Sequence, residues 1–231
     1  MNKRLYNWCR KLRLSINNAY EVGVYNPENC SLRDFIKDGV NCTLIEADPV
    51  CADRLKKSFK DNQNVKILNK AVWDKSKTVT LYRAGSSTFI EGIPGSPAVI
   101  NDNYVLNDGD KFQVDGIEFS SIDDGKINLL LVDIEGAEWY VLKHLISRPA
   151  VISLEMQAGV YRNPFYKEIT AWLGENDYRL WFKNDTDNVY IKKGIVKFRF
   201  IYLIQLFFYN LRESSIQKIN FLKKKLKKAL R

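Results

Sequence analysis

The chain has a single histidine and no paired cysteines, which argues against a zinc site. Its 231 residues include His144 alone and four cysteines, Cys9, Cys30, Cys42 and Cys51, none of them in a C-x-x-C pair or beside a histidine. Zinc sites in proteins are built mainly from cysteine and histidine at short spacings. We therefore expect reduced thiols, as in a cytoplasm, and no zinc.

Long uninterrupted apolar segments are also missing. The N-terminal residues are basic but lack the apolar core of roughly 7–15 residues that a secretory signal requires. Residues 195–211 are strongly apolar, yet Lys197, Arg199 and Gln205 interrupt them. No clean stretch of about 20 residues is therefore available to span a membrane. The expected location is the cytoplasm.

Positive charge is concentrated at the C-terminal end of the chain. The formal net charge is +9, and residues 195–231 hold ten Lys and Arg against one acid, Glu213, so residues 1–194 sum to zero. Binding of nucleic acid would normally need a basic face on the folded domain. Nucleic acid is therefore not an expected partner.

The C-terminal segment is expected to form a basic amphipathic helix. From Ile216 to Leu230 apolar residues recur at helical intervals among lysines, which is typical of a helix in a membrane interface. We expect residues 195–231 to attach the protein peripherally to an anionic cytoplasmic membrane face. The alternative is a helix packed on the domain or on a second subunit, and a homo-oligomer is compatible with it.

Strand and helix signals alternate along the chain, which predicts a doubly wound α/β sheet with helices on both faces. We assign residues 1–17 to a basic leader helix, 18–193 to a Rossmann-like domain and 194–231 to the basic tail. The segment between Ala84 and Gly116 shows no obvious elements, so a functional loop or hairpin insertion is expected there. The expected strands are 19–24, 42–47, 65–72, 78–82, 129–132 and 151–155, with a closing hairpin of 178–182 and 188–191. Helices are expected over 31–37, 49–60, from about 138 to 147, and over 165–173.

The most informative segment is LLLVDIEGAEWYVLKHL, residues 129–145. A continuous apolar run predicts a strand covered on both faces, and the spacing then becomes helical. Asp133, Glu135 and Glu138 lie where the strand gives way to the helix. Burying carboxylates at such a point costs free energy, which indicates that they have a function. Open α/β sheets bind ligands beyond the carboxyl ends of their strands. Asp133 is therefore a candidate site residue, whereas Glu138 could equally cap the helix.

Glu46 ends the second expected strand, 23 positions after Gly23 of the first. An acid about 20 residues beyond the first glycine of a nucleotide-binding turn typically accepts hydrogen bonds from ribose hydroxyls. The loop after Gly23 lacks the second and third glycines of G-x-G-x-x-G, so close approach to a pyrophosphate is not provided for. This pattern disfavours NAD or FAD and favours a nucleoside without a diphosphate.

Several short motifs together resemble the FkbM family of S-adenosylmethionine-dependent methyltransferases. They are EVG (21–23), IEADP (45–49), NKAVWD (69–74), SSIDD (120–124), the D-x-E-G-x-E core (133–138) and VISLEM (151–156). The resemblance spans roughly residues 18–192, and the D-x-E-G-x-E core is its most specific element. It implies a class I, Rossmann-like methyltransferase fold.

The resemblance also implies roles for single residues at the cofactor. Glu21 and Gly23 match the turn that holds the methionine part of S-adenosylmethionine, and Glu46 matches the ribose acid. Ala71 and its neighbours match the stretch beside adenine, and Asp133 is assigned to cofactor binding as well. The first loop of this chain has fewer glycines than is common in the family.

For catalysis, Asp133 and Glu135 match the family's acidic junction close to the transferred methyl group, and Glu155 matches an acid that ends the next strand. The lysine that often precedes the aspartate is replaced here by Val132 or Leu131. A sugar hydroxyl is a poor acid, so its methylation needs a base, and we assign that role to Asp133 or Glu135.

The expected activity is O-methylation of a sugar in a surface polysaccharide or glycolipid. A divalent metal bridging the acids is a second, less favoured interpretation, because carboxylates suit a hard ion. Two alternatives to the expected activity are a membrane-associated scaffold that has lost catalysis and, less favoured because the domain is neutral, an RNA methyltransferase.

Overall fold

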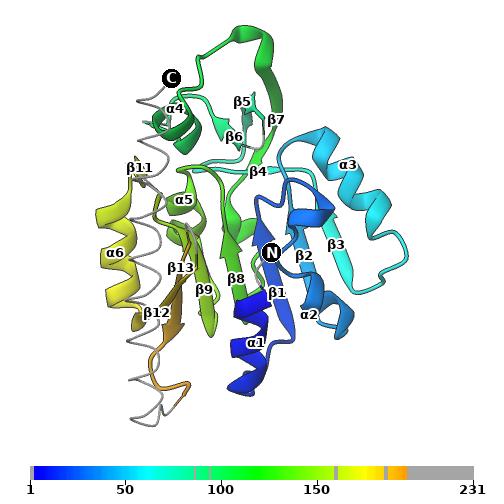
Figure 1. The fold of residues 1–231 in the computed structure, drawn as a ribbon, viewed down its shortest axis with the longest axis vertical. Coiled ribbons are helices and arrows are strands. Elements are labelled where there is room, and N and C mark those ends of the chain that lie inside the picture. The colour runs from blue at the N-terminus through cyan, green and yellow to red at the C-terminus, as the bar shows by residue number, and fades with distance from the viewer. Residues whose placement is uncertain (1–2, 86, 94, 159–160, 185–186, 197–231) are drawn as a thin grey trace, which may run out of the picture.

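The computed structural model describes residues 3–85, 87–93, 95–158, 161–184 and 187–196 (Figure 1). Its centre is a seven-stranded sheet in the order β12-β13-β9-β8-β1-β2-β3. The five strands from β9 to β3 run parallel, whereas β13 is antiparallel to β9 and pairs with β12 in a hairpin. The strands are β1 (Asn18–Val22), β2 (Asn41–Ile45), β3 (Val65–Leu68), β8 (Leu129–Val132), β9 (Val151–Glu155), β12 (Tyr178–Asn184) and β13 (Asp187–Lys192).

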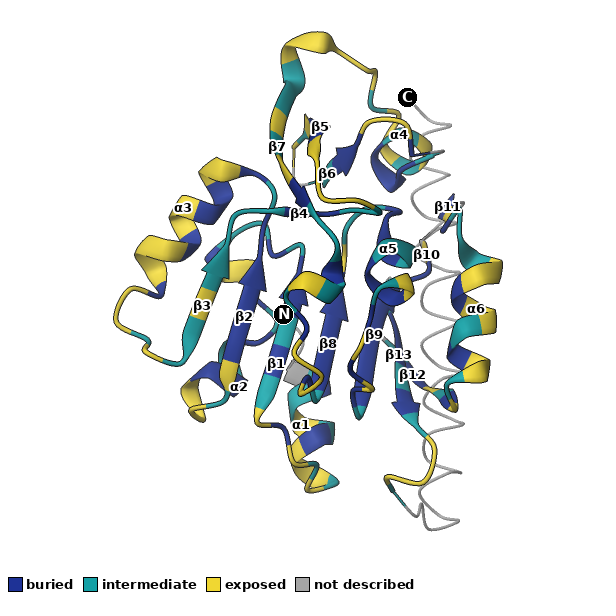
Figure 2. Cartoon of the chain, turned by 180° about the vertical axis from the view of Figure 1, so that it is seen from behind, coloured by how far each residue is buried: buried dark blue, intermediate teal, exposed yellow. Residues whose placement is uncertain are grey.

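Helices cover both faces of this sheet, because the strands bury apolar side chains on both sides. Leu129 and Leu131 of β8 belong to a core shared with α1, α2 and α3, while Leu130 and Val132 belong to a core shared with α5 and α6. Figure 2 shows the central strands buried along most of their length. The helices are α1 (Lys3–Lys11), α2 (Arg33–Lys37), α3 (Pro49–Ser58), α5 (Glu138–Lys143) and α6 (Tyr166–Glu175).

A second sheet lies beyond the carboxyl ends of the parallel strands, at the top of Figure 1. It has the order β4-β7-β5-β6 and is accompanied by the short helix α4 (Pro97–Asp102). Its strands are β4 (Ala71–Val72), β5 (Thr78–Ala84), β6 (Ser87–Ile90) and β7 (Lys111–Ile117). We call the segment from β5 to β7 the cap, because it stands over one end of the main sheet.

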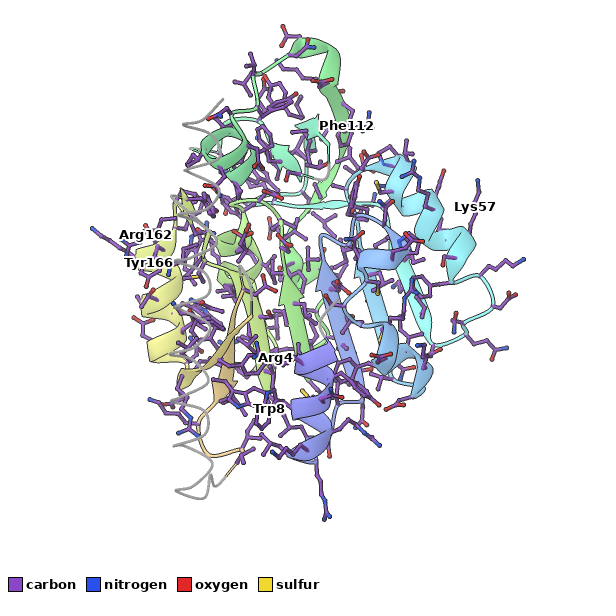
Figure 3. All side chains as sticks on the ribbon, in the orientation of Figure 1. Arg4, Trp8, Lys57, Phe112, Arg162 and Tyr166 are labelled. Carbon is purple, nitrogen blue, oxygen red and sulfur yellow. The ribbon has the colours of Figure 1, made fainter. Side chains whose placement is uncertain are left out.

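Short elements complete the fold. They are the 3₁₀ turns η1 (Pro27–Asn29), η2 (Asp108–Asp110) and η3 (Phe119–Ser121), and the two-stranded β10 (Gln157–Ala158) and β11 (Tyr161–Arg162). Figure 3 shows Arg162 and Tyr166 side by side where β11 leads into α6, and the Arg162 Cζ lies 3.8 Å from the centre of the Tyr166 ring.

The N-terminal segment contains the expected helix, α1, which packs on the sheet. Leu5 and Cys9 are fully buried against it. The Arg4 guanidinium donates a hydrogen bond of 3.2 Å to the carbonyl of Lys183, and Trp8 contacts Trp181. Arg4 and Trp8 are both labelled on this helix in Figure 3.

The doubly wound sheet with helices on both faces is confirmed, but two expectations for single elements are wrong. Residues 65–72 form two strands in different sheets, β3 and β4, because the chain turns at Asn69 and Lys70. Of the two forms expected for the segment 84–116, the structure has the hairpin insertion: β6 pairs with the end of β5, and α4 and β7 follow. Helix α5 ends at Lys143, short of Ser147, whose hydroxyl accepts a hydrogen bond from the Ile127 amide.

All four cysteines are free and buried. Within the described ranges, no helix combines the length and apolar character needed to cross a membrane. The expected interfacial helix falls in residues 197–231, which lie outside the described residues.

Candidate active site

A cleft of about 340 Å³ opens where β1, β2 and β8 end and where β4, β5 and β6 face them. This volume lies within the range of about 300–1,000 Å³ that is usual for small-molecule sites. The lining includes Glu21, Gly23, Glu46, Ala71, Asp133 and Glu135. The structure therefore brings six of the seven residues assigned from the sequence to one cavity, and the seventh, Glu155, lies behind its floor.

Gly23 permits the close approach of two strand ends at the floor of the cleft. Its φ of +83° lies in the left-handed region, and a Cβ atom at this position would overlap the carbonyl oxygen of Asp133. The Asp133 amide in turn donates a hydrogen bond of 2.9 Å to the carbonyl of Val22. The turn after β1 is thus in direct contact with the start of the segment that joins β8 to α5.

Glu46 organises the loop that follows β1. Its carboxylate accepts hydrogen bonds from the amides of Val24 at 3.1 Å, Tyr25 at 2.7 Å and Asp48 at 2.8 Å. Burial raises the pKa of Glu46, and the three amides oppose that shift by stabilising the charged form. An ionised carboxylate offers about four acceptor positions, so these amides leave room for one ribose hydroxyl.

Glu21, in β1, organises a second loop in the same way, the one that contains Cys30, Ser31 and Leu32. Its carboxylate accepts hydrogen bonds from the amides of Ser31 at 2.9 Å and Leu32 at 3.2 Å, and a weaker one from the Cys30 thiol. Burial raises the pKa of Glu21 to about 7 despite these donors. Glu21 therefore shapes the loop at the methionine end of the expected cofactor site and also lines the cleft.

Asp133 and Glu135 present carboxylates at the junction of β8 and α5. Water reaches Asp133 from the cleft, yet the surrounding protein removes part of its hydration and, with the charge of Glu46, raises its pKa to about 6. Burial and the charge of Asp133 raise the pKa of Glu135 to about 8, although the Ser87 hydroxyl donates a hydrogen bond to it. Glu135 also has a φ of +56°, a strained backbone conformation of a kind found at functional sites.

Two further acids stand behind the floor of the cleft. Glu138 is fully buried and accepts hydrogen bonds from the amides of Ile134 and Gly136 and from the side-chain amide of Asn163. Glu155 ends β9, is only 6% exposed, and has a pKa that burial and the charge of Asp133 raise to about 10. Glu138 thus holds the loop that leads into α5, inside the acidic cluster, and does not cap the helix in the way the sequence alternative expected, because no side chain caps its first amides.

Ala71 lies at the opposite wall, where β4 pairs with β7. Its neighbour Lys70 is the one basic side chain that lines the cleft in the described part of the chain, and its ammonium lies 2.7 Å from the Asp115 carboxylate. The side-chain amide of Asn69 donates to the carbonyls of Glu46 and Ala47, both at 2.9 Å. These contacts tie the β4 side of the cleft to Glu46.

His144 lies away from the cleft. Its Nε2 is 3.3 Å from Asp74, and Lys143 also pairs with that aspartate. The lowered pKa of Asp74, caused first by Lys143, fits this surface cluster. The only histidine of the chain is therefore not placed to act as a base at the acidic junction.

Sequence reasoning did not find Asn163 or Arg83, and it gave Asn69 only as the first residue of the NKAVWD motif. Asn163 is 25 residues from Glu138, and no local pattern links the two. Arg83 from the cap forms a bidentate pair with Asp48, the residue that caps α3. The Asp48 carboxylate accepts the Val50 amide at the same time, which the D-P pair at 48–49 does signal. Burial alone would raise the pKa of Asp48, but these donors lower it.

The cleft fits the cofactor that the sequence implies. Carboxylates outnumber cations along its wall, whereas S-adenosylmethionine brings a sulfonium and an ammonium group. The sheet order, with an antiparallel seventh strand inserted beside the fifth and an acid-lined cleft at the carboxyl ends, is that of a Rossmann-like, class I methyltransferase.

A model of the methyltransferase FkbM domain matches residues 21–180. The chain belongs to this family of S-adenosylmethionine-dependent methyltransferases. A search of curated proteins gives no match.

Solved methyltransferase structures resemble the chain at low identity. WbdD, described as a bifunctional kinase-methyltransferase, is 11% identical with a TM-score of 0.44, covering 82% of this chain and 39% of WbdD. The methyltransferase domain of bacterial CtHen1 is 10% identical with a TM-score of 0.44, covering 82% and 95%. The glycopeptide N-methyltransferase MtfA, complexed with sinefungin, is 8% identical with a TM-score of 0.41, covering 83% and 86%. The chain thus spans well under half the length of WbdD.

Proposed function

We propose that this methyltransferase transfers a methyl group to a hydroxyl of a sugar in a surface polysaccharide or glycolipid. The observation that carries the proposal is the pair Asp133 and Glu135. Both lie on the cleft wall, and in the described ranges neither forms an ion pair with a Lys, Arg or His side chain. A carboxylate without a cationic partner remains free to accept a proton.

The reaction requires two things of the protein: alignment of the acceptor oxygen with the methyl group, and removal of the hydroxyl proton. S-adenosylmethionine, when bound, supplies the methyl group on a sulfonium that leaves readily. Alignment of the acceptor oxygen can contribute up to about 7–11 kcal/mol to lowering the barrier. Removal of the hydroxyl proton by a positioned base contributes roughly 10²–10⁴-fold in rate.

Glu135 and Asp133 suit the base role to different degrees. The raised pKa of Glu135, about 8, makes its carboxylate the stronger base, since a base is most effective when its pKa lies near the working pH. Asp133, with a pKa of about 6, is more fully ionised at neutral pH. We therefore propose Glu135 as the base that accepts the hydroxyl proton, with Asp133 as the second candidate.

A sugar acceptor is supported by the polarity of the cleft near these acids. Thr88, Ser153 and Asp187 line it together with the carboxylates. Hydroxyl and carboxylate groups recognise the several hydroxyls of a sugar by hydrogen bonding, and apolar acceptors would leave them unpaired. The cap supplies Thr88 from β6, so the acceptor side of the cleft is built partly by the insertion.

We also propose that residues 195–231 bind an anionic membrane, which would bring the enzyme to an acceptor carried on lipid. The support is the sequence alone, ten basic residues set among apolar ones. Flotation of the full chain with anionic and with zwitterionic vesicles, at low and high salt, tests this. Recovery that is the same with both vesicles would contradict it.

The test of activity uses purified protein, S-adenosylmethionine and surface glycans from a strain that lacks the gene. Transfer of labelled methyl to glycan is expected for the native chain and for Glu175→Gln, an exposed acid on α6 that serves as the matched control. Glu135→Gln and Asp133→Asn are expected to bind the cofactor but to lower turnover, one of them by at least about 10²-fold. Near-normal turnover by both variants would refute the base assignment.

Two outcomes would point to the alternatives. Calorimetry that shows no binding of S-adenosylmethionine would favour a scaffold that has lost catalysis. A salt-sensitive gel shift of RNA, with methyl transfer to RNA and none to glycan, would favour an RNA methyltransferase.

A further inference from the structure

Three carboxylates from three different elements converge behind the floor of the cleft. Asp133 follows β8, Glu138 begins α5 and Glu155 ends β9, and one oxygen of each lies within 4.8 Å of the others. Oxygens around a bound divalent cation lie about 2.0–2.6 Å from it, so two ligands of one ion are at most about 4–5 Å apart. The three oxygens therefore have the spacing of a shared ion.

Hydrogen bonds hold the Glu138 carboxylate in place. The amides of Ile134 at 3.0 Å and Gly136 at 3.3 Å donate to its Oε1, and the Asn163 side chain donates to its Oε2. Asn163 is itself held in place: its backbone amide donates a hydrogen bond to the Met156 carbonyl, and its side-chain oxygen accepts one from the Phe165 amide. Such outer contacts fix the orientation of a metal ligand, and the carboxylate keeps lone pairs for an ion.

Two buried polar atoms next to this cluster have no partner. The Oε2 of Glu155 is buried without a hydrogen bond, in a residue that is only 6% exposed. The hydroxyl of Tyr161, a residue only 1% exposed, also lacks a partner and lies 3.4 Å from where a Cβ on Gly136 would stand. A buried polar group without a partner lowers the stability of the fold by about 1–3 kcal/mol, so each of these two atoms is expected to have a bound partner.

No cationic side chain neutralises these acids. In the parts of the chain that the structure describes, no Lys, Arg or His forms an ion pair with Asp133, Glu138 or Glu155. Lys70, the basic residue of the cleft lining, is engaged by Asp115. The charge must be balanced either by protons on the carboxylates or by a cation from solution.

We propose that Asp133, Glu138 and Glu155 bind a hard divalent cation, such as Mg²⁺ or Mn²⁺. All three ligands are carboxylate oxygens, the donor type that these ions prefer. Asp133 is exposed to the cleft and gives the ion its route of entry, whereas Glu138 and Glu155 hold it from behind.

An ion at this position would take part in the reaction. Asp133 lines the same cleft as Glu135, so open coordination positions would face the acceptor. A cation there would orient the acceptor hydroxyl and make its proton easier to remove by Glu135. This task rests on the proposed O-methyl transfer, whereas metal binding itself does not.

The test measures binding of Mn²⁺ alone to the full chain after treatment with EDTA, by calorimetry and by the loss of the free-ion EPR signal at pH 8. One site per chain is expected, with affinity lowered at least tenfold in Glu155→Gln and in Asp133→Asn. Glu175→Gln, an exposed acid far along α6, is the matched control and is expected to bind as the native chain does. Asp133→Asn keeps the test valid if Glu155→Gln does not fold, because Asp133 is an exposed residue.

S-adenosylmethionine binding is measured in parallel on the same EDTA-treated samples, so the two proposals can fail separately. Cofactor binding without any Mn²⁺ binding at millimolar concentration would overturn the metal site and leave the methyltransferase function intact. Equal Mn²⁺ affinity in the native chain and in both variants would also overturn it. Saturable binding that both variants lose would support it.

Discussion

Gly23 and Asp133 meet at a point where no side-chain atom fits between them. A Cβ on Gly23 would overlap the carbonyl oxygen of Asp133, and the Asp133 amide donates to Val22, the residue before the glycine. Two segments far apart in the sequence, the turn after β1 and the acidic junction after β8, are therefore in direct contact. A change in either one displaces the other.

Substitution of Gly23 by alanine is expected to destabilise the fold and to abolish cofactor binding. The φ of +83° and the overlap with Asp133 act together, and the expected loss is about 2–4 kcal/mol in the free energy of unfolding. Gly39→Ala is the matched control, because Gly39 has a φ of +80° but no atom within 4 Å of a Cβ. Urea denaturation should show a loss of only about 1–2 kcal/mol for the control, and equal losses would contradict the contact.

Glu46→Gln is expected to weaken binding of S-adenosylmethionine at least tenfold. The neutral amide would be a poorer acceptor for the amides of Val24, Tyr25 and Asp48, so the loop around the ribose would lose its anchor. A tenfold loss corresponds to about 1.4 kcal/mol. Calorimetry on this variant measures it, and an unchanged dissociation constant would show that Glu46 does not organise the cofactor site.

Glu155→Gln is expected to stabilise the metal-free protein increasingly as the pH rises. The folded-state pKa of Glu155 is raised from 4.5 to about 10, so its protonated form is favoured by folding. That contribution is complete below about pH 4.5 and is lost as the pH rises toward 10, whereas glutamine does not titrate. Melting temperatures of both proteins in EDTA from pH 5 to 9 should diverge, and a constant difference would refute the raised pKa.

The pH dependence of methyl transfer is expected to identify the base. A base works only when deprotonated, so kcat/KM rises with pH through the pKa of the group in the free enzyme. A midpoint near pH 8 would identify Glu135, and one near pH 6 would identify Asp133. The profile should be flat across this range if neither carboxylate accepts the proton.

The sequence predicted the sheet and most of the cleft because these features are encoded locally. Leu129–Val132 alternates between two apolar cores, and Glu46 and Asp133 follow strands whose carboxyl ends must meet at one edge. The sequence predicted β5 and a loop or hairpin insertion after it, but it did not give the bounds of β6, α4 and β7, because these strands pair within the cap and contain no long apolar run. Asn163 was missed because its contact with Glu138 exists only after the chain has folded.

The cap begins after β4 and ends with β7, which pairs with β4 through Ala71 and Gly116. The two ends of the cap thus lie side by side. The ion pair between Arg83 of β5 and Asp48 links the cap to the start of α3. The length of such an excursion can change without displacing the strand ends that form the floor of the cleft. The stretch from Thr78 to Ile117 is therefore the natural place to graft new residues above the cleft.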